Sequence, residues 1–276
     1  MRQLASRVAV AAPSGARGMA TLKEISTRLR SVKSIEKITK SMKMVSSAKL
    51  TKAERRVKEV RALGDSATVL TEKAGLTFGD NDTKQLYVAV CSDKGLCGGV
   101  HSAVNKYIKA QLADVPAGTE VKLALVGDKS TTVLARTNAG DIIVTAAQVG
   151  KKPALFDEAS MIAEEITSNV YDYTSATVVY NWYKNAGQYI TKTMKLPGLA
   201  PMLESEELQV YDEELSEENL TSYGEFQLAS AIYYAQLEGS ASEQAARVQA
   251  MENASSNASD MIGDLTLQFN RTRQAV

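Results

Sequence analysis

The sequence predicts an α/β protein that combines a long antiparallel coiled coil of its N- and C-terminal helices with a central α/β domain. Three observations support this fold class. Residues 20–63 contain no Gly or Pro, and apolar residues recur there in steps of three and four, as on one side of a long helix. A second pattern of this kind runs from Leu220 to Val276. Between the two, short β-rich runs alternate with helical stretches, which is typical of a largely parallel sheet.

The first pattern predicts an N-terminal coiled-coil helix over residues 20–75. Its expected buried stripe consists of Leu22, Ile25, Leu29, Val32, Ile35, Ile38, Met42, Val45 and Ala48. A basic side accompanies this stripe, formed by Lys33, Lys37, Lys40 and Lys43 and continued by Lys49, Lys52, Arg55 and Arg56. Two interpretations of this basic side stay open. It faces water and keeps the protein soluble, as charged helix faces commonly do, or it faces an acidic surface of a partner.

The second pattern predicts a C-terminal coiled-coil helix over residues 206–276. Its expected stripe, narrower and richer in Ala, consists of Phe226, Ile232, Ala235, Ala241, Ala245, Val248, Met251, Ala254, Ala258, Ile262, Leu265 and Phe269. Small side chains let two helix axes approach closely, so the two terminal helices should pair antiparallel. Residues 196–246 contain acids but no Lys or Arg, and the acidic stretch 204–218 is interpreted as a solvated link.

The middle of the chain predicts a Rossmann-like α/β domain over residues 76–205. Its β-rich runs are 85–92, 121–127, 142–145 and 177–183, and its helical stretches lie near 100–113, 129–137 and 156–171. A further run at 189–195 should add one strand at an edge of the sheet, because Pro197 follows it.

Composition restricts the possible environments. The formal net charge is zero, which gives no reason to expect nucleic acid as a partner. Two cysteines are too few for a disulfide framework and suit a reducing compartment, so both thiols should be free. Residues 1–19 contain Arg, Ala and Ser but no acid, which is the composition of a mitochondrial transit peptide. A disordered cytosolic tail is the other interpretation of this segment.

A glycine-rich segment follows the first predicted strand of the central domain and precedes a helix. Its candidate functional residues are Asp93, Gly95, Cys97, Gly98 and Gly99. The spacing matches neither G-x-G-x-x-G nor a P-loop, so no nucleotide cofactor is expected, and the glycines are better explained by a tight turn.

Catalytic and metal chemistry find little support in the sequence. His101 is the only histidine, and with Cys97 it supplies two of the four ligands of a structural zinc site, so no metal is expected. A Cys97–His101 catalytic pair is conceivable at a helix start, where a thiol pKa falls, but no third group is evident to orient it. The chain is therefore not expected to be an enzyme.

Several blocks, in order, resemble one known family. They are Ala20–Ile25 (ATLKEI), Ile35–Val45 (IEKITKSMKMV), Asp93–Gly99 (DKGLCGG), Ser242–Asn253 (SEQAARVQAMEN) and Asn270–Ala275 (NRTRQA). Together they are similar to the gamma subunit of ATP synthase over essentially the whole chain after residue 19. The resemblance also implies a further helical segment after Val276.

The resemblance implies a central stalk rotor subunit without an active site of its own. The terminal helices would stand inside a ring of three alpha and three beta subunits, and the α/β domain would form a foot beside the delta and epsilon subunits on the membrane ring of c subunits (c-ring). Such a complex lies on the matrix side of the mitochondrial inner membrane. By the same resemblance, Lys40, Met42 and Lys43 would meet an acidic loop of beta, and Arg247 and Gln274 would contact a second beta loop.

Two other functions are compatible with parts of the sequence. An enzyme built on the central domain, with helical arms for dimerisation, predicts catalytic residues converging at strand ends. A coiled-coil tether or holdase without a rotary role explains the helices, and it predicts a stable monomer in solution.

Overall fold

The computed structural model describes residues 21–73, 83–116, 118–169, 172–205, 208 and 216–275. The predicted transit peptide (1–19) and most of the predicted acidic link lie outside these residues. Two compact units are present, one formed by residues 21–38 with 255–275 and one by residues 39–254. Of the described helices, none is long and apolar enough to cross a bilayer.

Two long helices contribute to both units: α1 (Leu22–Lys73) and α7 (Glu217–Ala275). Helix α1 starts with a capping box, in which the Thr21 amide donates to Glu24 Oε2 (2.8 Å) and the Glu24 amide donates to Thr21 Oγ1 (3.3 Å). The observed α1 and α7 confirm both predicted terminal helices. The predicted domain boundaries within the chain stay predictions.

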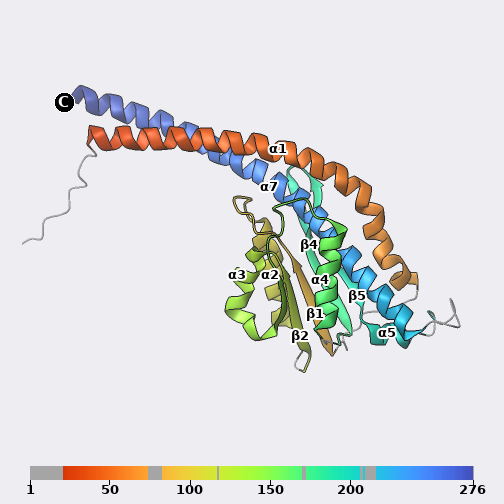
Figure 1. Ribbon diagram of the computed structural model, residues 1–276. Coiled ribbons are helices and arrows are strands. Elements are labelled where there is room, and N and C mark those ends of the chain that lie inside the picture. Colours follow the sequence, from red (N-terminus) through yellow and green to blue (C-terminus); the bar gives the residue numbers. More distant parts are fainter. Residues whose placement is uncertain are drawn as a thin grey trace, which may run out of the picture. The chain divides into compact units, whose positions relative to one another are not determined.

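The unit of residues 39–254 contains a five-stranded sheet with the order β3-β2-β1-β4-β5 (Figure 1). Its strands are β1 (Lys84–Val90), β2 (Glu120–Val126), β3 (Ile142–Ala146), β4 (Ser175–Asn185) and β5 (Gln188–Pro197). The first four strands are parallel, and β5 pairs antiparallel with β4 at the edge. The prediction of an additional edge strand before Pro197 is therefore confirmed.

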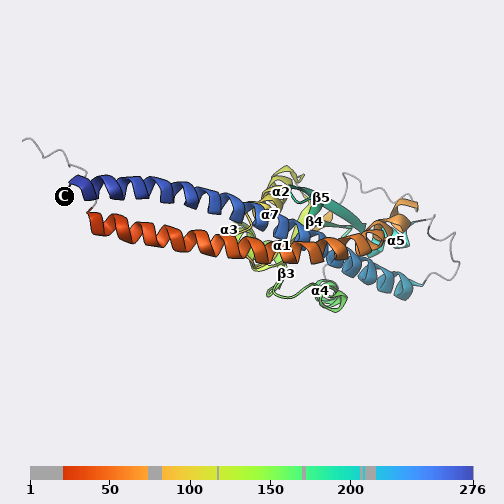
Figure 2. The same ribbon diagram turned by 90° about the horizontal axis from the view of Figure 1, so that it is seen from above.

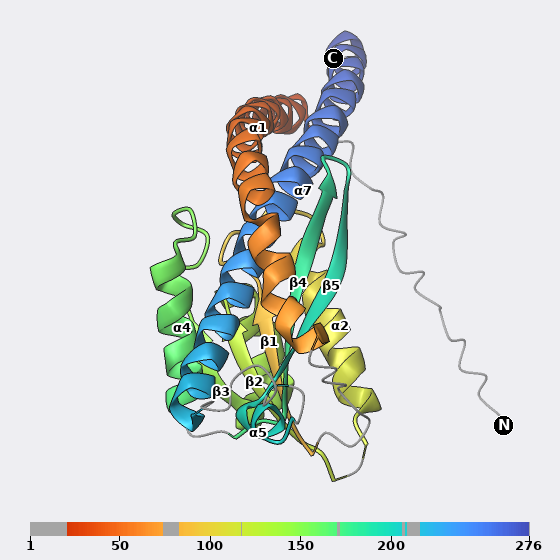
Figure 3. The ribbon, with the colours of Figure 1, turned by 90° about the vertical axis from the view of Figure 1, so that its right-hand side faces the viewer.

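Helices cover both faces of this sheet. The remaining described helices are α2 (Val100–Asp114), α3 (Asp128–Asn138), η1 (Ala139–Asp141), α4 (Phe156–Ser168) and α5 (Leu199–Leu203). Because side chains alternate along a strand, Leu86 and Val88 pack on the α4 and α7 side, whereas Tyr87 and Ala89 pack on the α2 and α3 side. Figure 3 shows the same layers edge-on.

Helix α7 does not present a narrow apolar stripe within this unit. From Gln227 to Val248 every residue is buried or half-buried, because α7 lies between the sheet and α1. Ile232 and Ala235 belong to the core shared with the sheet, whereas Leu237 and Ala241 pack against α1. The predicted stripe residues Ile232, Ala235 and Ala241 are buried, but the prediction of a narrow stripe is wrong over this length, since the helix has core neighbours on two sides.

The unit of residues 21–38 and 255–275 is a two-helix coiled coil. Figure 2 shows the two helix ends side by side and antiparallel. A single seam joins them, formed by Ile25, Leu29, Val32, Ala258, Ile262, Leu265 and Phe269. The predicted pairing of the terminal helices is confirmed in this unit.

The buried residues of α1 follow a stricter period than the predicted stripe. Ile25, Val32, Thr39 and Ser46 are spaced by seven residues and all are buried. The predicted Ile35, Ile38 and Val45 are instead 51%, 57% and 55% exposed. The predicted stripe runs from Val32 to Ile35 to Ile38 in two consecutive steps of three residues. A seam with a period of 3.5 residues alternates steps of three and four, so repeated steps of three move a position away from the buried face.

Candidate functional site

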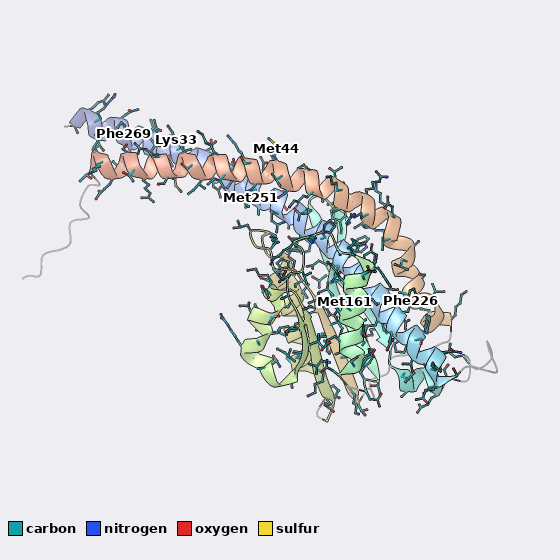
Figure 4. The ribbon with its side chains drawn as sticks, in the orientation of Figure 1. Lys33, Met44, Met161, Phe226, Met251 and Phe269 are labelled. Carbon is teal, nitrogen blue, oxygen red and sulfur yellow. The ribbon has the colours of Figure 1, made fainter. Side chains whose placement is uncertain are left out.

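The predicted contact residues of α1 differ in their surroundings. Lys40 is exposed, whereas Met42 and Lys43 are half-buried, and Lys43 forms an ion pair with Glu252 of α7. The two apolar residues next to them, Met44 and Val45, are 75% and 55% exposed. Figure 4 shows Met44 on the side of α1 turned away from α7. We call Lys40, Met44 and Val45 the outer face of α1.

An outer face of this kind needs an explanation because apolar side chains are costly to leave in water. Contiguous exposed apolar patches with a polar rim are one feature of surfaces that bind other proteins, whereas single exposed apolar residues are common on any protein. Thr39 and Ser46 occupy the seam positions beside them, so the neighbouring apolar side chains point outward. The outer face is thus a consequence of the heptad register of α1.

The predicted turn residues form a compact, well-bonded segment. Gly98 has φ of 61°, a left-handed conformation that favours glycine, and Gly99 immediately precedes α2. Asp93 Oδ1 accepts a hydrogen bond from the Asp128 amide (2.9 Å), which ties the turn to α3. These bonds agree with the prediction of a tight strand-to-helix turn.

Arg247 joins this turn to α7, which sequence analysis did not anticipate. It is only 8% exposed, and its Nε and Nη2 atoms donate to Gly95 O at 3.2 and 3.1 Å. Nη2 also donates to Glu243 Oε1 (2.5 Å), and Glu243 Oε2 accepts from Ser92 Oγ (2.5 Å). The structure therefore brings Arg247 together with the Asp93–Gly99 turn. Its predicted contact with a beta subunit stays a prediction.

Gln274 belongs to the unit of residues 21–38 and 255–275, whereas the turn belongs to the unit of residues 39–254. Gln274 is exposed near the end of α7. Its side chain is free of the burial that constrains Arg247, so the two residues predicted to meet the same beta loop differ in their surroundings.

The Cys97–His101 pair lacks the chemistry of a nucleophile and its base. Burial raises the pKa of the Cys97 thiol, and its Sγ atom contacts Lys94 O (3.8 Å). Burial lowers the pKa of His101, whose Nε2 atom lies 3.1 Å from Lys94 O and 3.4 Å from Ser92 Oγ. An activated cysteine requires a lowered thiol pKa, so these shifts have the wrong sign for catalysis. Both cysteines are free, as expected, and both are buried.

Side chains of α7 occupy the end of the sheet where ligands bind in many doubly wound folds. Ser92 lies two residues after the end of β1, and its hydroxyl donates a hydrogen bond to Glu243 of α7. A cavity of about 40 Å³ remains beside it, lined in part by His101, Asn181 and Gln236. Within the part of the chain that is described, no group of three or more His, Cys, Asp or Glu side chains could hold a metal ion.

A second group of polar residues, which the sequence does not predict, consists of Arg61, Tyr183 and Glu238. Glu238 is completely buried and forms an ion pair with Arg61 (3.0 Å). The only available signal was a single acid in an apolar stretch of the last helix, and that signal gives no partner.

The similar sequences and the similar solved structures both come from ATP synthases. Residues 21–276 match the family described as ATP synthase. The chain is 48% identical to the mitochondrial ATP synthase subunit gamma of Drosophila melanogaster, over 94% of this chain and 87% of the fly protein. It is 43% identical to the gamma subunit of the mitochondrial ATP synthase F(1) complex of Rattus norvegicus, over 93% of this chain and 94% of the rat protein.

Solved structures show the same fold. A chain of the Tetrahymena thermophila mitochondrial ATP synthase, from its central stalk and c-ring, has a TM-score of 0.66 at 30% identity and covers 79% of this chain and 99% of its own. A chain of the Euglena gracilis mitochondrial ATP synthase rotor has a TM-score of 0.76 at 23% identity, covering 92% and 98%. The fold and these relatives define a central-stalk subunit of an ATP synthase. Within that class, the chain belongs to the ATP synthase gamma subunit family.

Proposed function

We propose that this chain is the rotor shaft of a mitochondrial ATP synthase. It couples rotation of the c-ring to conformational changes in a ring of three alpha and three beta subunits, together with the delta and epsilon subunits. The site of action is the matrix side of the inner membrane. Family membership supports this proposal, as do structural relatives taken from a central stalk with its c-ring.

The outer face of α1 is the observation that carries the proposal at residue level. Met44 is 75% exposed, more than any other exposed large apolar side chain of α1 in the described residues, and the cation Lys40 lies four residues before it on the same helix. A shaft must contact its surrounding ring without binding one subunit permanently. Exposed apolar side chains next to cations can form such contacts with an acidic loop of beta.

Rotation changes nucleotide affinity through differential contacts. A ligand shifts an equilibrium only by its different affinity for the two states, and the same holds for a shaft that touches each beta subunit differently. Because only one side of α1 carries the outer face, each beta subunit meets a different surface at each angle. The chain thereby biases chemically identical subunits toward different conformations.

The chain itself contributes no catalytic group in this proposal. Cys97 and His101 are structural residues of the turn, and their shifted pKa values support this assignment. Arg247 and Glu243 hold the turn against α7. Phosphate chemistry takes place on the beta subunits.

Co-purification tests the assembly. The chain is expressed with ATP synthase alpha and beta subunits, and we expect one copy for each three alpha and beta pairs together with a higher ATPase rate. A stable monomer that leaves alpha and beta unbound would favour the tether instead. An enzymatic turnover by the chain alone would favour the enzyme.

Charge reversal tests the outer face. Lys40→Glu should lower ATP-driven proton pumping by the complete complex in vesicles, because it places a negative charge opposite an acidic loop. Lys43→Glu should lower pumping as well, but it also opposes Glu252, its ion-pair partner on α7, so Lys40→Glu is the direct test of the outer face. Lys58→Glu is the matched control, an exposed lysine of the same helix outside the predicted contacts. Unchanged pumping in the Lys40 and Lys43 variants would count against the proposed contact.

A further inference from the structure

Strand β4 extends beyond its neighbour β1. The two strands pair from Gln85 with Ser175 to Ala89 with Val179, whereas β4 continues to Asn185. On its other side β4 stays paired with β5 over this extension. Beyond Val179, the backbone N–H and C=O groups of β4 that face the β1 side have no β1 residue to pair with. Buried backbone groups of this kind need other hydrogen-bond partners.

Side chains of α1 and α7 provide these partners. The Tyr183 amide donates to Glu238 Oε2 (2.8 Å), and Arg61 Nη2 donates to Tyr183 O (2.7 Å). One turn further along α7, Ser242 Oγ donates to Asn181 O (3.0 Å). The two helices thus continue the hydrogen bonding of the sheet past the end of β1.

An ion pair connects the two helices at the same place. Arg61 Nε donates to Glu238 Oε1 (3.0 Å), and the Tyr234 hydroxyl donates to the same oxygen (3.2 Å). Glu238 is 0% exposed, so its charge needs these donors. Each charged group contacts both the other helix and the backbone of β4.

Close packing surrounds this pair. The Arg61 guanidinium lies 5.0 Å from the centroid of the Trp182 ring, and Lys192 Nζ of β5 lies 3.9 Å from it. A Cβ atom at Gly64 would be 2.6 Å from the Tyr234 ring, so only glycine permits α1 to approach α7 this closely. The contacts leave little freedom for one element to slide past another.

We propose that Arg61 and Glu238 are positioning residues that fix the angle of α1 and α7 against the α/β sheet, and that torque between sheet and helices passes through them. Apolar burial is non-directional and resists separation more than sliding. Hydrogen bonds are directional and resist sliding. This inference rests on the proposed rotor function, because torque has meaning only in a rotating complex.

Torsional stiffness is the measurement that tests the proposal. The alpha and beta ring of the assembled complex is fixed to a surface, nucleotide turnover is stalled, and a bead is attached to the α/β domain through Lys109→Cys. The angular variance of the bead is inversely related to stiffness. Glu238→Gln keeps the size of the side chain but removes the charge, and we expect a wider angular distribution than in the wild type.

A double variant separates positioning from simple stability. Replacing a buried ion pair by apolar side chains of similar size is often neutral or stabilising. Arg61→Met with Glu238→Met leaves no unpaired charge, so it should recover part of the thermal midpoint that Glu238→Gln lowers, but the distribution should stay wide because the Tyr183 backbone remains without the two side chains that pair with it. Emission of Trp182, the single tryptophan, reports whether the packing around the pair is retained.

Each outcome decides between the hypotheses. A distribution that narrows to the wild-type width together with the recovered midpoint would show that the pair serves stability alone, and would overturn the proposal. An unchanged width in Glu238→Gln would overturn it as well. Arg55→Met, which breaks the exposed Arg55–Glu59 pair of the same helix, is the control and should leave the width unchanged. A wild-type complex that fails to rotate would refute the rotor function itself.

Discussion

Helix α7 has two kinds of surroundings along one continuous helix. Between Gln227 and Val248 every residue is buried or half-buried, whereas from Ser256 to Ala275 only Ala258, Ile262, Leu265, Phe269 and Thr272 are not exposed. The first segment is a core helix of an α/β domain, and the second is one helix of a two-helix coiled coil. The difference teaches that helix length alone says little about what stabilises a helix, because tertiary packing does so in one segment and a thin seam in the other.

The largest effect should come from the packed segment. Ile232→Ala removes a fully buried side chain of the main core, and large-to-small core substitutions of this type cost about 2–5 kcal/mol. Urea denaturation of the chain measures the loss in free energy of unfolding. Phe226→Ala is the control, since Phe226 is 54% exposed on the same helix. Equal losses for both would remove the distinction between packed and exposed positions of α7.

A seam substitution should act locally. Leu265→Ala weakens the coiled-coil seam, so amides near it should exchange faster with deuterium, while the unfolding midpoint of the α/β domain changes little. The exposed Leu267 provides the matched control in Leu267→Ala. A large shift of the main unfolding midpoint would mean that the coiled coil and the domain unfold as one cooperative unit.

A pH titration sharpens the comparison because the single histidine contacts the segment that packs against α7. Burial lowers the pKa of His101 below its ordinary value, despite nearby Glu243, while Arg247 and Lys129 oppose protonation. The unfolded chain therefore binds the proton more readily, and stability should be retained above the ordinary histidine pKa of about 6.5 and fall below it.

The thermal midpoint at about pH 7.5 and 5.5, on either side of that value, measures this effect. His101→Gln should show a smaller decrease between the two conditions. An identical decrease in wild type and variant would show that His101 does not contribute to acid sensitivity.

The smallest effect concerns thiol reactivity. Burial raises the pKa of Cys91 to about 12 and also raises that of Cys97, so both should alkylate slowly in the native protein and rapidly after denaturation. Ser66→Cys, at an exposed position of α1, should react quickly and serves as the reference. Native alkylation of Cys97 at the rate of that reference would show that burial does not protect this thiol.

The periodic elements of the fold could be predicted from sequence because their signals are local. Alternation and flanking turns located the strands, and Pro197 placed β5 at an edge. The buried faces were harder, since a list of apolar residues does not reveal that Thr39 and Ser46 occupy the seam of α1. Which residues of α1 are buried depends on the register in which α1 packs against α7. That register depends on both helices and cannot be read from the sequence of one of them.

The polar contacts could not be predicted for a related reason. Arg61 and Glu238 are separated by 177 residues, and neither residue carries a motif. Arg247 was predicted as a contact to a beta loop from a resemblance, but in the structure it is buried and bonds to Gly95, which is 152 residues away in the sequence. Which charges are solvated and which are paired is decided by topology, and charge patterns along the chain do not contain that information.

The coiled-coil unit also has a consequence for the order of events at the ribosome. Its seam joins Ile25, among the first described residues, to Leu265 and Phe269 near the end of the chain. The first half of the seam is therefore synthesised long before its partner exists, whereas the sheet strands from Lys84 to Pro197 emerge in between. Sheet pairing can begin while the chain is still growing, whereas the coiled-coil seam cannot be completed before translation has passed Phe269.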